Sequence, residues 1–131
     1  MRVAFTSSNG SVIDQHFGQC GRFWIWEVGP ATAAPIGEVE ALAAGDEDDR
    51  TTARAAAVAG CAIVFTRQIG GPAAAKLAAR RIHPMKLQAD VPIAEAVTRL
   101  QEVLRGTPPP WLRRLLAQDE ATDETDARRG G

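Results

Sequence analysis

Residues 2–28 read RVAFTSSNGSVIDQHFGQCGRFWIWEV, which is two apolar segments joined by a polar loop. The first segment, Arg2–Thr6, is short and apolar and runs into a Ser-Ser-Asn-Gly turn, a pattern that predicts a buried strand. The second segment, Arg22–Val28, alternates as a strand does and would place both of its tryptophans on one face. The loop Thr6–Phe23 is therefore expected to hang between two strands of one sheet.

This loop concentrates the side chains that bind transition metals. It holds one of the two histidines of the chain, His16, and one of the two cysteines, Cys20, among several glycines. Imidazole and thiolate suit borderline and soft metals, so we expect His16 and Cys20 to be metal ligands. The alternatives are that His16 hydrogen-bonds within the loop to fix its turn, and that Cys20 is a partly buried small side chain.

The composition limits the classes of function. The chain has 131 residues, 45% of them hydrophobic and 24% charged, as an ordinary globular domain has. Its net charge of −1 gives no electrostatic reason to expect nucleic acid or a membrane as a partner. No apolar run approaches the roughly 20 residues of a membrane-spanning helix, and no signal-peptide pattern follows Met1. We therefore expect a cytoplasmic protein.

The cysteine count excludes several kinds of site. In a reducing compartment Cys20 and Cys61 are not expected to form a disulfide, and two thiols cannot cage an iron–sulfur cluster with four thiolates. Cys61 is predicted to lie in the core. The spacings of a closed zinc site, a phosphate loop and a Ser-His-Asp set are all missing from the sequence. An enzyme is consequently the class that we expect least.

Beyond the second strand, strand-like and helix-like segments alternate. The acidic residues 45–49, GDEDD, are expected to form a loop before an alanine-rich helix that has Asp49 or Thr51 as its N-cap. Pro72 is expected at the first position of a later helix. The further predicted strands are Ile36–Leu42, Ala62–Phe65 and Pro84–Leu87, and the predicted helices are Thr51–Ala59, Pro72–Arg80 and residues 90–106.

Three regions follow from these elements. Residues 1–106 are predicted to form an α/β domain that binds the ligand. Residues 107–117 contain a run of three prolines and are expected to turn and to pack a short helix, which contains Trp111, back on the domain. Residues 118–131 are polar and acidic, which predicts a disordered tail.

The order of the elements predicts the topology of the sheet. Three strands with short connections favour an antiparallel meander, and the later units add parallel strands through right-handed crossovers. If the fourth strand pairs with the first, the result is a mixed five-stranded sheet of order 3-2-1-4-5 with helices on its faces. This α/β arrangement resembles the ribonuclease H-like architecture. The first strand carries no carboxylate, so the two-metal chemistry of a nuclease is not expected.

This topology predicts where a ligand would bind. In open α/β sheets, ligands bind beyond the carboxyl ends of the strands, where the connections diverge. A helix that begins with glycines offers free N–H groups to an anion, and arginines beside it would add positive charge, unless they are ordinary surface arginines. The sequence therefore predicts one crevice with two walls, formed by His16, Cys20 and Arg22 on one side and by Arg67, Gln68, Gly70 and Gly71 on the other.

Several segments together resemble one protein family. The start MRVAF and the loop motif DQHFG before an apolar strand are similar to the dinitrogenase iron–molybdenum cofactor family. This family includes NifX, the cofactor-binding region of NafY and the C-terminal part of NifB. The segments that most resemble its NifX branch, over about residues 1–116, are GDEDD, GCAIVF, IGGPAAAKL, IHPMKL and GTPPPWLRRLL.

The resemblance implies a non-enzymatic carrier in nitrogen fixation. Such a carrier binds the iron–sulfur cluster precursor of the iron–molybdenum cofactor, which NifB makes, and passes it to the NifEN-type scaffold. In NafY, cofactor binding is ascribed to the histidine of the HFG motif, which is His16 here, whereas Cys20 lies where relatives vary. Two alternatives remain: a small-anion or nucleotide-binding regulatory domain that uses the same crevice, and an interaction module that recruits partners through the Trp111 helix.

Overall fold

The computed structural model describes residues 1–41 and 45–117. The predicted tail, residues 118–131, and Leu42, at the end of a predicted strand, lie outside the described residues. In the described part of the chain, no helix has both the length and the apolar character that a membrane crossing requires. The helical elements are η1 (Phe17–Gln19), α1 (Glu47–Ala57), α2 (Gly71–Ala79), α3 (Ile93–Arg105) and a segment over residues 110–117.

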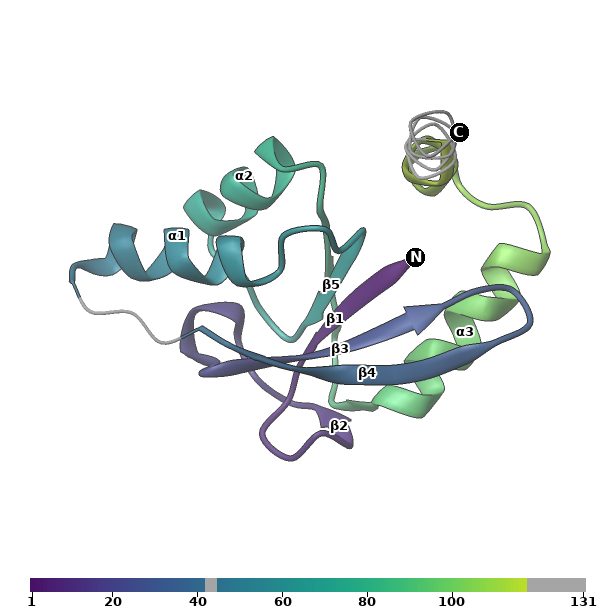
Figure 1. Cartoon of the computed structure of the whole chain (residues 1–131), viewed down its shortest axis with the longest axis horizontal. Coiled ribbons are helices and arrows are strands. Elements are labelled where there is room, and N and C mark those ends of the chain that lie inside the picture. Colours follow the sequence, from purple (N-terminus) through teal and green to yellow (C-terminus); the bar gives the residue numbers. More distant parts are fainter. Residues whose placement is uncertain (42–44, 118–131) are drawn as a thin grey trace, which may run out of the picture.

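A mixed sheet of five strands forms the centre of the fold (Figure 1). β1 pairs antiparallel with β3 and parallel with β5, while β4 extends the sheet beyond β3 and β6 extends it beyond β5. The order β4-β3-β1-β5-β6 reads 3-2-1-4-5 when these five strands are counted along the chain. The strands are β1 (Arg2–Thr6), β3 (Arg22–Val28), β4 (Ala33–Glu40), β5 (Ile63–Thr66) and β6 (His83–Lys86).

Helices cover both faces of this sheet, α1 and α2 one face and α3 the other (Figure 1). Successive strand residues point to opposite faces, so each central strand contributes to two cores. Ala4 and Val64 lie in the core with α1 and α2, whereas Phe5 and Phe65 lie in the core with α3. Both tryptophans of β3 pack on the α3 side, as the alternation of that strand predicted.

The polar loop after β1 contains a small ribbon that the sequence did not predict. β2 (Val12–Ile13) pairs antiparallel with β7 (Val91–Pro92) as a separate two-stranded sheet. The amide of Ile93 donates to the carbonyl oxygen of Ser11 at 2.8 Å, and Ile13 is fully buried. The ribbon ties the first half of the loop to the start of α3.

The last three residues of GDEDD form the first turn of α1, so the predicted acidic loop is wrong there, and so is the predicted N-cap at Asp49 or Thr51, since the N-cap is Asp46. α1 begins at Glu47 because Asp46 and Asp49 form a capping box. The amide of Asp49 donates to the Asp46 carboxylate at 2.8 Å, and the amide of Asp46 donates to the Asp49 carboxylate at 3.3 Å. The carboxylates of this first turn lie at the positive end of the helix dipole, which they stabilise.

The strand predicted at Ile36–Leu42 begins earlier, at Ala33. Its pairing with β3 sets the start, because Ala33 lies opposite Val28 across a short turn. The other predicted strands and the helix predicted at Pro72–Arg80 lie within one residue of the observed ones, the usual uncertainty of element ends. The helix predicted over residues 90–106 begins only at Ile93, because Val91–Pro92 pair with β2 as a strand.

The helix over residues 110–117 packs on the α3 side of the sheet. Leu112 is fully buried, and Trp111 and Leu115 lie at the edge of that core. The ring of Trp111 stacks on His83 of β6 with 3.8 Å between ring centroids and 10° between the planes. The segment after the prolines therefore returns to the domain.

Candidate functional site

The carboxyl ends of β1 and β5, where the sequence predicted a crevice, are closed. Both strands end in a fully buried threonine, Thr6 and Thr66. The carbonyl oxygen of Gln15 accepts from Oγ1 of Thr6 at 2.9 Å, from Oγ1 of Thr66 at 3.1 Å and from the amide of Arg67 at 3.0 Å. Directly at the strand ends the chain is packed, because the buried hydroxyl groups need an acceptor and the loop supplies it.

His16 follows directly and stands exposed on the loop. Its backbone forms an isolated parallel bridge with Gln68, and the amides of Gln19 and Cys20 both donate to the His16 carbonyl oxygen at 3.1 Å. The imidazole itself makes no hydrogen bond to any residue in the described ranges. Backbone bonds therefore fix this turn, and the side chain is left available to a ligand.

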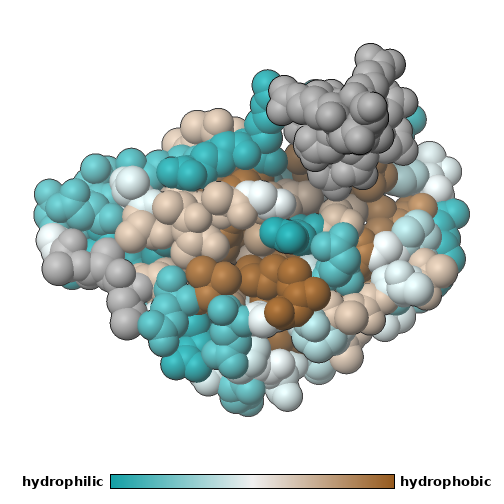
Figure 2. Space-filling model, in the orientation of Figure 1, coloured by the Kyte–Doolittle hydropathy of each residue, from teal (hydrophilic) through white to brown (hydrophobic). Residues whose placement is uncertain are grey.

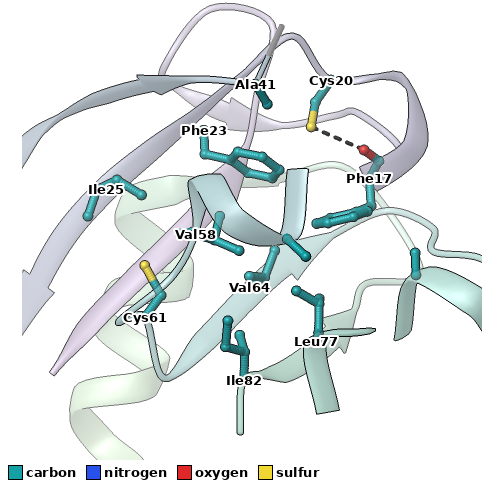
Figure 3. Close-up of a cluster of buried hydrophobic side chains, with 13 residues drawn as sticks. Phe17, Cys20, Phe23, Ile25, Ala41, Val58, Cys61, Val64, Leu77 and Ile82 are labelled. Atoms are coloured by element: carbon teal, nitrogen blue, oxygen red, sulfur yellow. Dashed lines mark hydrogen bonds between the residues drawn. The ribbon is translucent and has the colours of Figure 1, made fainter. Parts of the chain in front are cut away.

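Phe17 and Cys20 point inward from the same turn (Figure 3). Both are fully buried, and the Phe17 ring packs on Phe23 with 5.4 Å between centroids. The Cys20 thiol donates to the carbonyl oxygen of Phe17 at 3.2 Å. Burial raises the pKa of the Cys20 thiol to about 11, so it stays protonated at neutral pH. The structure thus places Cys20 in the core, and the expectation that it lines a crevice with His16 is wrong.

The two predicted anion-binding arginines are engaged elsewhere. Arg22 pairs with Glu38 on the neighbouring strand at 2.7 Å. Arg67 forms an ion pair with Asp90 and donates through Nε to the carbonyl oxygen of Leu87 at 3.3 Å. These contacts hold β4 and the segment after β6, and the expected grouping of both guanidinium groups around His16 is not observed.

An open hollow of about 450 Å³ lies where the His16 turn approaches the first turns of α1 and α2. Gly18 of the turn and Gly70 before α2 both line it. A Cβ atom built on either glycine, or on Gly71, would meet no atom within 4 Å, and none of the three has a positive φ. The fold therefore does not require glycine at these positions. The missing side chains leave open space at the surface.

The wall of the hollow that α1 contributes is acidic. It consists of Asp46, Glu47 and Asp48, with Thr51 one turn further along. The Asp46 carboxylate caps the helix, and Asp48 pairs with Lys76 of α2 at 3.2 Å. The hollow therefore has a neutral glycine side and a negative side.

Three side chains that support the His16 turn were missed by the sequence reasoning. Arg54 of α1 donates through Nε to the carbonyl oxygen of Cys20 at 3.2 Å and holds the end of the turn. Thr6 and Thr66 hold its beginning. The two threonines had a visible signal, since each is the polar last residue of an apolar strand, whereas nothing in the sequence pointed to Arg54.

A second hollow, of about 220 Å³, lies between α1 and the edge strand β4. Its lining includes Ile36 and Val39 of β4 and the thiol-bearing Cys61, which is 6% exposed. Ile36 is 52% exposed, and this part of the surface is the apolar patch at the centre of the view in Figure 2. No residue of the His16 turn, residues 16–20, is among those that line this second hollow.

The donor set of the site is sparse. Among residues 1–41 and 45–117, no three His, Cys, Asp or Glu side chains come together as a metal site. One exposed imidazole, two residues before Gly18 of the hollow, cannot cage a bare ion. It can add a single ligand to a metal cluster that arrives with its own bridging atoms.

Fold and site together define an α/β domain that presents one imidazole beside an open surface. The fold is shared with the crystal structure of PH0822, at a TM-score of 0.64 and 18% identity over 78% of this chain and 91% of that one. Protein NifY of Azotobacter vinelandii is 37% identical over 91% of this chain and 49% of its own length. Protein NifX of Sinorhizobium fredii is 32% identical over 90% of this chain and 79% of its own length.

Residues 1–103 match the family described as dinitrogenase iron-molybdenum cofactor. The chain belongs to this family, and within it the chain is similar to the NifX and NifY proteins. It spans about half the length of NifY. Membership connects the chain with nitrogen fixation and with the biosynthesis of the iron–molybdenum cofactor.

Proposed function

We propose that this chain is a non-enzymatic carrier of an iron–sulfur precursor of the iron–molybdenum cofactor. It receives the precursor from a NifB-type protein and passes it to a NifEN-type scaffold. The observation that supports this role is the exposed imidazole of His16, whose turn is anchored on both sides and borders the hollow lined by Gly18 and Gly70.

The chemistry of one ligand suits a carrier. A preassembled cluster already carries sulfides on most iron positions, so a single imidazole can hold it without replacing its ligand shell. Sparse ligation also permits release, because one bond must break instead of four. Cys20 does not enter this proposal, since its protonated sulfur lies in the core.

The cargo is expected to seat on the glycine side of the hollow. Gly18 and Gly70 leave backbone accessible there, and the N–H groups at the start of α2 carry partial positive charge. The acidic side opposes a net negative cluster and would favour its departure. Arg22 and Arg67 could contact the cargo only after leaving their ion pairs.

We also propose that the domain has the ribonuclease H-like architecture. The strand order and the strand directions support this assignment. The absence of carboxylates from β1 separates the chain from nucleases of that architecture.

The experiment is anaerobic mixing of the chain with the precursor isolated from a NifB-type protein. Bound iron per chain is then measured after gel filtration. We expect wild type to retain the precursor and His16→Ala to bind it about tenfold or more weakly, since changes even around metal ligands cost 10–100-fold in affinity. The control is His83→Phe, which alters the other histidine and keeps a ring against Trp111.

Equal binding by His16→Ala and wild type would remove His16 as the ligand. A thermal shift with phosphate-bearing ligands that is indifferent to His16 would instead favour the small-anion or nucleotide-binding alternative. Loss of scaffold binding on removal of residues 108–131, with precursor binding intact, would assign partner recruitment to that segment.

A further inference from the structure

We infer that Thr6 and Thr66 are positioning residues for His16. Their hydroxyl groups hold the backbone beside His16 and so place its imidazole where the cargo binds. This inference rests on the proposed function, in which His16 is the ligand. It assigns the role to two side chains that never reach the surface, because both are fully buried.

The two threonines are unusual within the core. The buried polar residues of the described chain are Thr6, Ser7 and Thr66, and all other buried residues there are hydrophobic. Thr6 and Thr66 end the two parallel strands at the centre of the sheet. Valine would fill nearly the same space without a hydroxyl to satisfy, so packing alone does not explain threonine at both positions.

The hydroxyl groups converge on the residue before His16. Thr6 and Thr66 both donate to the Gln15 carbonyl oxygen, at 2.9 Å and 3.1 Å. The amide of Arg67 donates to the same oxygen at 3.0 Å. A carbonyl oxygen offers two lone pairs, so these three donors share it. The Thr6 hydroxyl also lies 3.3 Å from the carbonyl oxygen of Phe65, and the Gln15 carbonyl is fully engaged.

Phe17, the residue after His16, is held by a backbone hydrogen bond next to the same threonine. The amide of Phe17 donates to the carbonyl oxygen of Gln68 at 2.8 Å, and that oxygen also lies 3.1 Å from Oγ1 of Thr66. The Thr66 hydroxyl therefore lies between two carbonyl oxygens, one from each loop, and donates its single proton to one of them at a time. His16 is the exposed residue between two anchored neighbours.

Anchoring of this kind affects binding through entropy. A ligand that binds a mobile loop must order it, and each ordered residue lowers the affinity. A histidine held in place by buried hydroxyl groups avoids that loss. Without the hydroxyl groups, the cargo would have to order the turn each time it bound.

The test compares Thr6→Val, Thr66→Val and Thr66→Ser with wild type, and Thr98→Val serves as the matched control. Oγ1 of Thr98 bonds to the Ala94 carbonyl oxygen on the exposed face of α3, away from the site. Without cargo, we expect the amides of Arg67 and Phe17 to exchange hydrogen about five- to tenfold faster in Thr6→Val and Thr66→Val than in wild type, the effect of one lost hydrogen bond. Thr66→Ser should restore slow exchange, and Thr98→Val should change neither amide.

The second measurement is a double-mutant cycle on binding of the precursor isolated from a NifB-type protein. We expect Thr66→Val to weaken binding about five- to tenfold in wild type and to have almost no further effect in His16→Ala, since the threonine acts through the histidine. Thr66→Ser should bind within about twofold of wild type. If Thr66→Val does not fold, Thr6→Val and Thr66→Ser complete the same comparison.

Equal loss from Thr66→Val in both backgrounds would overturn the inference, because a merely structural role acts regardless of His16. Unchanged amide exchange would overturn it as well. If wild type itself does not bind the precursor, the proposed function fails. If His16→Ala alone leaves precursor binding unchanged, His16 is not the ligand, whereas the exchange measurement still decides whether the threonines hold the turn.

Discussion

Replacing Gly18 by leucine should block the cargo without harming the fold. A Cβ atom at Gly18 meets no atom within 4 Å and φ there is not positive, so leucine fits without strain. Loss of chain entropy in the unfolded state should raise the free energy of unfolding by about 0.4–1 kcal/mol. The leucine side chain projects into the hollow of about 450 Å³ that borders the His16 turn, where it would displace the cluster.

Gly21 provides the matched control. It lies on the same loop, is equally open and is exposed, and it does not line the hollow. Gly21→Leu should therefore be as stable as Gly18→Leu and bind the cargo as wild type does. We expect Gly18→Leu to lose about tenfold or more in affinity, which corresponds to about 1.4 kcal/mol or more.

The assay is a titration with the isolated precursor under anaerobic conditions, read as iron retained per chain after gel filtration. Urea unfolding of the same samples gives the stability. If Gly18→Leu binds the precursor as wild type does, the cargo does not bind in this hollow. Equal loss in both variants would show that any bulk on the loop interferes, and a large loss of stability in Gly18→Leu would refute the geometric argument.

Phe17→Ala should lower the free energy of unfolding by about 3–5 kcal/mol, since Phe17 is fully buried, and urea unfolding that shows less than half this loss would contradict the packing described. Burial lowers the pKa of His83 from its ordinary value of 6.5, so below pH 6.5 the unfolded chain binds a proton that the folded chain does not. The free energy of unfolding should therefore fall as pH drops below that value, and it should fall less in His83→Phe; equal slopes would show that His83 is not involved. Glu47→Gln should tighten binding of an anionic cargo about two- to fivefold at low salt and not in high salt, with Glu102→Gln on α3 unchanged. Weaker binding by Glu47→Gln would indicate a cargo that is not net negative.

The sheet was predictable because its strands carry their own pattern. β1 and β5 are uninterrupted apolar segments, and β3 alternates so regularly that its faces could be assigned. These patterns arise from burial, which acts on every residue of a strand. The β2–β7 ribbon was not predictable, because two-residue strands have no periodicity and their pairing joins segments far apart in the sequence.

The environment of the site was less predictable because it depends on single contacts. His16 was singled out by its chemistry, and the structure shows that it is exposed. Whether Cys20 points inward depends on the turn that Phe17 anchors, and a sequence motif does not reveal this direction. The start of α1 was misjudged because an acidic run suits a loop or a capped first turn, and only the reciprocal Asp46 and Asp49 bonds decide between them.

The edge strand β4 has a consequence for how this protein behaves at high concentration. It is eight residues long, has no strand beyond it in the sheet among the residues that the structure describes, and leaves Ile36 52% exposed. A long edge of this kind is a template on which a second chain can add a strand. Pro35 offers no N–H group to an incoming strand, and Glu38 and Glu40 would bring like charges together in a self-associated pair. The apolar patch can therefore stay exposed while the backbone beside it resists aggregation.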